Sequence, residues 1–171
     1  MIRRPLSIAL LAVLGSTSAS CHGDDDPAAI AGSYTIAITN GKNRCNLQNW
    51  DEGATSSNIP FTITQDGSSL MGTVEGAAAI VIVALLGSAD YDGHADGDSF
   101  VLQNFGTRSF TSGDCAFTIK STVNGSIAGD VLMGTIEYTP VTNESPACMN
   151  LEACSSEQLF NGTRPPMLPG K

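Results

Sequence analysis

Apolar and polar residues alternate over long stretches of this chain. In residues 33–39, SYTIAIT, every second side chain from Tyr34 onward is large and apolar, and the residues between them are small or carry a hydroxyl group. A period of two with many β-branched residues is typical of a β-strand that is buried on one face and solvated on the other. The same alternation recurs in residues 59–64, 115–123 and 131–139. The sequence therefore predicts an all-β domain.

Dipeptides that favour tight turns lie between or beside these segments. Glycine, asparagine and aspartate accept the positive φ angles of hairpin turns, and they occur together at Asp66-Gly67, Asp96-Gly97, Asn124-Gly125 and Gly129-Asp130. About eight to ten short strands at this spacing fit an antiparallel up-and-down β-barrel, lipocalin-like in architecture, with a β-sandwich as the alternative. Gly72 and Gly134 fall inside predicted strands, where glycine marks a bulge, a bend or a close approach.

The alternation breaks in residues 76–89, GAAAIVIVALLGSA. Its ten consecutive apolar residues, 77–86, are fewer than the about 20 that a membrane-spanning helix needs. They predict either a strand buried on both faces or a short core helix. A contact surface for a ligand or a second protein is the alternative interpretation. Two other segments, residues 46–52 and 148–160, look helical for a turn or two.

Residues 1–20 have the three parts of a signal peptide. Arg3 and Arg4 supply positive charge, residues 6–14 are apolar, and residues 16–20 are small. This order is typical of a segment that directs export and is then removed. We therefore expect an exported protein.

The segment Ser18-Ala19-Ser20-Cys21 resembles the lipobox of bacterial lipoprotein precursors. Members of that family usually have leucine where Ser18 stands. The resemblance implies that Cys21 becomes the first mature residue and carries a lipid anchor of diacylglycerol and palmitate. It also implies that the protein is held at an envelope membrane, in the outer membrane or at the cell surface. Plain secretion after ordinary cleavage is the alternative.

The chain after the leader divides into a tether and one domain. Residues 21–31 begin CHGDDDP, which is polar and acidic and predicts a short flexible tether behind the lipidated cysteine. Residues 32–171 are long enough to form a single β domain with a core. The whole chain has a net charge of −9, and loss of the leader removes two arginines. An acidic surface repels nucleic-acid phosphates, so we expect no nucleic-acid partner.

The five cysteines support export and anchoring. An odd number leaves one thiol without a partner in an oxidising compartment, and lipidation of Cys21 gives that residue a role. The remaining four lack the C-x-x-C spacing of a metal site and predict two disulfides. We expect Cys45–Cys115 and Cys148–Cys154. A regular helix through residues 148–154 would separate the second pair by about 9 Å and exclude it.

Candidate chemistry is sparse. Residues 90–98, DYDGHADGD, place acidic groups and His94 at every second position, and Asp92, Asp96 and Asp98 are weak candidates for a calcium site. The same spacing fits the solvated face of a strand that enters a turn. No catalytic motif accompanies His94, so we expect neither enzymatic activity nor a cofactor, and a hydrolase is the least favoured alternative.

The sequence thus predicts an envelope lipoprotein whose disulfide-bonded β domain is a binding or structural module. Its partner is an envelope protein, or a small apolar ligand if the barrel acts as a carrier. The large side chains on the predicted inward faces favour a filled interior, so any pocket should be small, apolar and close to residues 90–98. The cavity volume distinguishes a ligand carrier from a structural module, because ligand pockets start at roughly 300 Å³.

Overall fold

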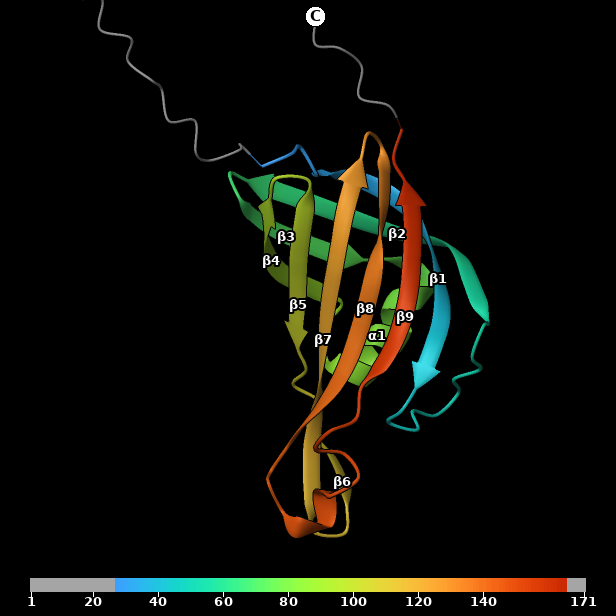
Figure 1. Cartoon of the computed structure of the whole chain (residues 1–171), viewed down its shortest axis with the longest axis vertical. Coiled ribbons are helices and arrows are strands. Elements are labelled where there is room, and N and C mark those ends of the chain that lie inside the picture. Colours follow the sequence, from blue (N-terminus) through green and yellow to red (C-terminus); the bar gives the residue numbers. More distant parts are fainter. Residues whose placement is uncertain (1–26, 166–171) are drawn as a thin grey trace, which may run out of the picture.

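The computed structural model describes residues 27–165 (Figure 1). The predicted signal peptide over residues 1–20 and the predicted lipid anchor Cys21 lie outside the described residues. No helix within residues 27–165 is long and apolar enough to cross a membrane.

The described part of the chain is built mainly of β-strands. One α-helix, α1 (Gly76–Leu86), follows the third strand, and a short 3-10 helix, η1 (Pro146–Cys148), precedes the last. The strands are β1 (Gly32–Asn43), β2 (Thr55–Asp66), β3 (Ser69–Val74), β4 (Asp90–Asp96), β5 (Ser99–Phe105), β6 (Phe110–Ser112), β7 (Cys115–Ala128), β8 (Val131–Thr142) and β9 (Ser156–Thr163).

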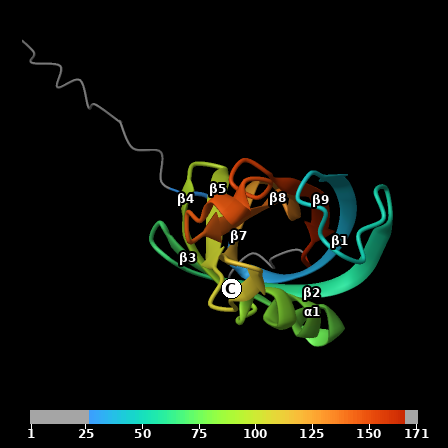
Figure 2. The same ribbon diagram turned by 90° about the horizontal axis from the view of Figure 1, so that it is seen from below.

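Eight of these strands close into a ring. From β1 to β5 and from β7 to β9 each strand pairs antiparallel with the next, β5 pairs with β7, and β9 returns to pair with β1. The short β6 lies outside the ring and extends the pairing of the first residues of β7. Figure 2 shows the ring from below. The predicted up-and-down barrel is confirmed, and the fold is not a β-sandwich.

The barrel has two different ends. The hairpin turns β2–β3, β4–β5 and β7–β8 lie at one end, which we call the filled end. The helix α1, strand β6 and residues 44–54, which we call loop 44–54, lie at the other, the open end (Figure 1). The predicted inward faces are correct at both ends: Phe117 is half-buried, and Tyr34, Ile36, Phe61, Ile63, Leu70, Val74, Phe100, Leu102 and Ile119 are buried.

Aromatic rings lie over glycines inside the barrel. A Cβ atom at Gly72 would lie 2.8 Å from Cζ of Phe61, and one at Gly125 would overlap the ring of Phe100. The prediction of a close approach at Gly72 is therefore confirmed. The predicted turn at Asn124-Gly125 is wrong, because both residues lie inside β7, where Gly125 leaves room for Phe100.

The apolar segment 77–86 is a surface helix and not a strand buried on both faces. Strands β3 and β4 pair directly, with Gly72 opposite Tyr91, so the segment between them has no sheet edge to join. A helix satisfies its own backbone groups, and Gly87 ends it in the left-handed conformation, with its N–H bonded to the Val83 carbonyl at 2.9 Å. The predicted short helix is therefore confirmed, but only Leu86 is fully buried, so the helix packs on the core from the surface and is not itself a core element.

The last strand was not predicted. Residues 156–160, which look helical in the sequence, belong to β9 and supply the pairing that closes the barrel. Burial alternates along the whole strand, but Phe160 is the only large apolar residue at its inward positions, so the sequence carries no period-two hydrophobic pattern there. Its conformation depends on two partner strands, β1 and β8, that are distant in the sequence.

Both disulfides lie at the open end, but the predicted pairing is wrong. The bonds are Cys45–Cys154 and Cys115–Cys148, each with a Cα–Cα distance of 5.0 Å. Strand register explains the first bond, because Asn43 pairs with Ser156 and so places Cys45 beside the segment that precedes β9.

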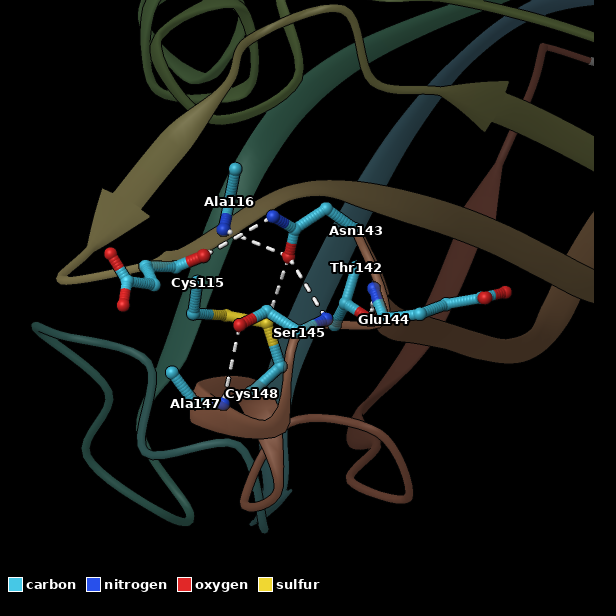
Figure 3. Close-up of a disulfide and its surroundings, with 9 residues drawn as sticks. Cys115, Ala116, Thr142, Asn143, Glu144, Ser145, Ala147 and Cys148 are labelled. Atoms are coloured by element: carbon cyan, nitrogen blue, oxygen red, sulfur yellow. Dashed lines mark hydrogen bonds between the residues drawn. A yellow bond between two sulfur atoms is a disulfide. The ribbon is translucent and has the colours of Figure 1, made fainter.

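Register also explains the second disulfide. Phe117 pairs with Thr142, which places Cys115 beside the chain that leaves β8 and leads to Cys148. Asn143 stabilises this corner, because its Oδ1 accepts a hydrogen bond from the Ala116 N–H at 3.2 Å (Figure 3).

Candidate ligand-binding cavity

The open half of the barrel contains a cavity of about 1020 Å³. Its walls are the inner faces of the surrounding strands, and α1 and loop 44–54 border its mouth. The predicted small volume is wrong, and of the predicted neighbourhood, residues 90–98, only Tyr91 lines the cavity. The filled end holds Phe100, Leu102 and Leu132, which are almost fully buried and do not line the cavity. The lining combines aliphatic side chains, such as Val123 and Ile136, with aromatic ones, such as Phe117 and Phe160.

The helix α1 forms one wall of the cavity. Ala78, Ile82 and Leu85 are half-buried, pack against the core and line the cavity. The outer side of the helix is also apolar, with 73% of Ile80 exposed. The helix carries no charged residue. The helix therefore has one side on the core and the cavity and an apolar side exposed to solvent.

A row of polar side chains crosses the cavity wall. The Tyr138 hydroxyl donates to Oε1 of Gln158 at 3.0 Å, and Nε2 of Gln158 donates to Oδ1 of Asn40 at 2.7 Å. Asn40 Nδ2 donates in turn to the Asp51 carbonyl at 3.1 Å in loop 44–54. We call Asn40, Gln158 and Tyr138 the polar row. It runs across neighbouring strands β1, β9 and β8.

A second tyrosine lies close to the polar row. The hydroxyls of Tyr91 and of the fully buried Ser121 are 3.4 Å apart. Burial raises the pKa of Tyr91, and a hydrogen bond with Ser121 partly opposes this effect. Burial also raises the pKa of Tyr138 well above its ordinary value, and Tyr91 acts in the same direction. Both phenols are therefore neutral at physiological pH.

The cavity walls carry no formal charge. Among the described residues that line the cavity there is no Asp, Glu, Lys, Arg or His, although the chain as a whole is strongly acidic. The polar lining groups are instead amides, hydroxyls and the indole N–H of Trp50. A neutral, mainly apolar guest fits such walls, because a buried charge without a partner is costly.

Trp50 is placed to report on the cavity. It is the single tryptophan of the chain, and it lines the cavity in loop 44–54. Its Nε1 donates to the Gly41 carbonyl at 3.0 Å. Its ring meets that of Tyr138 edge to face, with the centroids 6.0 Å apart. A ligand beside the polar row would therefore change the surroundings of this fluorophore.

The candidate metal residues do not form a site in the structure. Asp92, Asp96 and Asp98 are exposed and lie on the outside of the barrel, while their neighbours Tyr91 and Ala95 are buried. No group of three His, Cys, Asp or Glu side chains within residues 27–165 could hold a metal ion. The alternation is that of a strand with one solvated face.

Sequence reasoning missed the polar row. The alternation in residues 131–139 puts Tyr138 on one face with Leu132 and Ile136, and that pattern alone does not reveal that its hydroxyl is a polar group inside the barrel. Tyr91 could have been placed inward from its position between exposed acidic residues. Gln158 could not, because β9 was read as helical.

No protein-family model matches this sequence, and no curated protein matches it. The solved structure of EF1p2_mFAP2b bound to DFHBI aligns with 79% of this chain and 93% of its own chain, at 11% identity and a TM-score of 0.36. A likeness at that score does not extend to function, so the cavity itself is the evidence from which a function can be proposed.

Proposed function

We propose that this domain binds a small apolar ligand inside the barrel. The observation that carries the proposal is the cavity of about 1020 Å³ with apolar, uncharged walls. That volume exceeds the roughly 300 Å³ at which ligand pockets start. Packed side chains fill one end of the barrel while the other end leaves this cavity, and a module that served purely as a structural spacer would not need this difference between its ends.

Titration with Nile red, a neutral dye that fluoresces in apolar surroundings, tests the proposal. We expect saturable dye fluorescence together with a change in Trp50 emission. A ligand held at 100 times its dissociation constant should raise the free energy of unfolding by about 2.7 kcal/mol, which thermal unfolding detects. Absence of both signals would contradict the proposal.

A matched pair of variants shows where the dye binds. Val123 is buried and lines the cavity, whereas Val141 on β8 is 53% exposed and does not line it. Val123→Phe places the larger ring in the cavity and should weaken dye binding. Val141→Phe adds the same ring to the outer surface and should leave the dissociation constant unchanged. Equal affinity in the two variants would place the dye outside the barrel.

The same proposal includes an exported, lipid-anchored chain, which rests on the lipobox resemblance at Cys21. The Ala28 N–H bonds the Gly97 carbonyl at 2.9 Å, so the described chain begins at the filled end. A short tether would then hold the filled end toward the membrane and leave the cavity mouth facing away. Cys21→Ser should move the protein from the membrane fraction to the soluble fraction, and mass spectrometry should detect the lipid only in the unsubstituted protein.

A further inference from the structure

We infer that the cavity selects uncharged ligands that carry a hydroxyl or carbonyl group, and that the polar row orients this group. The inference rests on the proposed function and specifies the ligand class. Three observations support it: the hydrogen-bond pattern of the polar row, the lack of charge in the cavity walls, and the position of the row beside apolar walls on several strands.

The polar row is ordered and still has capacity to bind a guest. Each member uses one donor to hold the next, from Tyr138 to Gln158 to Asn40 and on to the backbone of loop 44–54. An amide has two N–H groups, and the second N–H of Gln158 has no partner among the described residues. A ligand oxygen can accept this hydrogen bond while the row keeps its own geometry. Because the row is already ordered, little conformational entropy is lost on binding.

The same row cannot neutralise a charge. A carboxylate or ammonium group beside Gln158 would lose its hydration without gaining an oppositely charged partner. The raised pKa values of Tyr91 and Tyr138 have the same physical cause, since burial disfavours the charged form of each phenol. A guest with a fixed charge would experience the same penalty. A hydroxyl or carbonyl keeps its hydrogen bond and avoids it.

The apolar part of the guest would extend from the polar row along the aliphatic walls. Ile136 lies on the same strand as Tyr138, and Ile38 lies on the same strand as Asn40, and both line the cavity. The helix residues Ile82 and Leu85 form another part of the wall. The geometry therefore fits an amphiphile with a small neutral head and an apolar body.

The test compares three probes with the same carbon chain: decanol, decanoic acid and decane. Binding is followed through Trp50 emission and displacement of Nile red, at neutral pH, on the full mature chain. We expect decanol to bind at least about tenfold more tightly than decanoate. The carboxylate would be buried without a charged partner, and one unsatisfied polar interaction lowers affinity by roughly a factor of ten. We also expect decanol to bind about 2- to 10-fold more tightly than decane, the range that one net hydrogen bond supplies.

Variants assign the preference to the polar row. Gln158→Leu removes the free N–H and should reduce the advantage of decanol over decane, while the affinity for decane stays within about twofold. Tyr34→Phe is the matched control, because it removes a buried hydroxyl at the filled end, where Tyr34 bonds the Ile30 carbonyl. We expect it to leave all three affinities unchanged. If Gln158→Leu fails to fold, Gln158→Met removes the same N–H with an unbranched side chain of similar length and gives the same comparison.

The pH dependence of decanoic acid binding tests the selectivity directly, because a purely structural change in the barrel would not make the affinity follow protonation of the probe. The titratable groups that line the cavity are Tyr91 and Tyr138, and neither ionises in acid. Lowering the pH until decanoic acid is neutral should therefore strengthen its binding toward that of decanol, whose affinity should not change. If decanoate binds as tightly as decanol at neutral pH, the inferred selectivity is wrong and the proposed function stands. If none of the probes, nor Nile red, binds, both fail.

Discussion

The two disulfides should contribute unequally to stability because they close chain segments of different length. Cys45 and Cys154 are separated by 109 residues, and Cys115 and Cys148 by 33. The chain-entropy relation assigns about 4.8 kcal/mol to the longer loop and about 3.7 kcal/mol to the shorter one at room temperature.

Two double variants measure the difference. Cys45→Ala with Cys154→Ala removes the first bond, and Cys115→Ala with Cys148→Ala removes the second, and alanine leaves no unsatisfied hydroxyl in either place. Urea unfolding followed by circular dichroism should show the larger loss of unfolding free energy for the first pair. A larger loss for the second pair would refute the loop-length reasoning.

The same variants separate stability from binding. The Cys45–Cys154 bond ties loop 44–54 to the segment before β9, and this loop carries Trp50 and borders the cavity mouth. Its removal should weaken Nile red binding under conditions where the variant remains folded. Cys115 and Cys148 do not line the cavity, so the second variant should keep its affinity. Non-reducing peptide mapping of the unsubstituted protein checks the pairing, and a Cys45–Cys115 peptide would overturn the register argument.

Three further predictions concern the packing and titration of the barrel. Gly125→Ala forces a methyl group against the Phe100 ring and should cost about 1–3 kcal/mol in thermal unfolding, and an unchanged melting temperature would contradict the packing described at the filled end. Arg164→Met removes the 3.0 Å bond to Asp130 and should lower the free energy of unfolding in urea by about 1–3 kcal/mol. An unchanged free energy of unfolding would contradict the contribution assigned to this bond. Burial raises the pKa of all three tyrosines. The folded chain therefore keeps protons that the unfolded chain releases near pH 10.0, so unfolding free energy should fall only above that pH, and Tyr138→Phe should reduce the fall. If tyrosinate absorbance appears at a lower pH than unfolding does, the folded chain releases these protons first, and the expected direction of the pH effect is wrong.

Most of the strands could be predicted because their signal is local. Residues 33–39 alternate with a period of two whatever lies beside them, and the apolar side of each strand identifies its inner face. The turns at Asp66-Gly67 and Asp96-Gly97 were also predictable, since their residues accept positive φ without help from neighbours. The closed up-and-down topology followed from strand number and spacing.

The errors arose where a residue's role depends on a distant neighbour. Gly125 reads as a turn residue until Phe100 from β5 is placed over it. The segment 156–160 reads as helical until β1 and β8 pair with it. The disulfides follow the register of β1 with β9 and of β7 with β8, which spacing along the chain does not reveal.

For the strands that carry a period-two hydrophobic pattern, the sequence by itself determined which side chains face the barrel interior, because alternation along a strand is a property of the backbone. Only the tertiary structure decided how much of that interior is filled, because filling depends on which rings and glycines meet across strands. Phe100 meets Gly125 at the filled end, whereas at the open end Val123 and Ile136 face a space bordered by α1. The polar row likewise exists only once β1, β9 and β8 lie side by side and bring Asn40 and Tyr138 each within hydrogen-bond distance of Gln158.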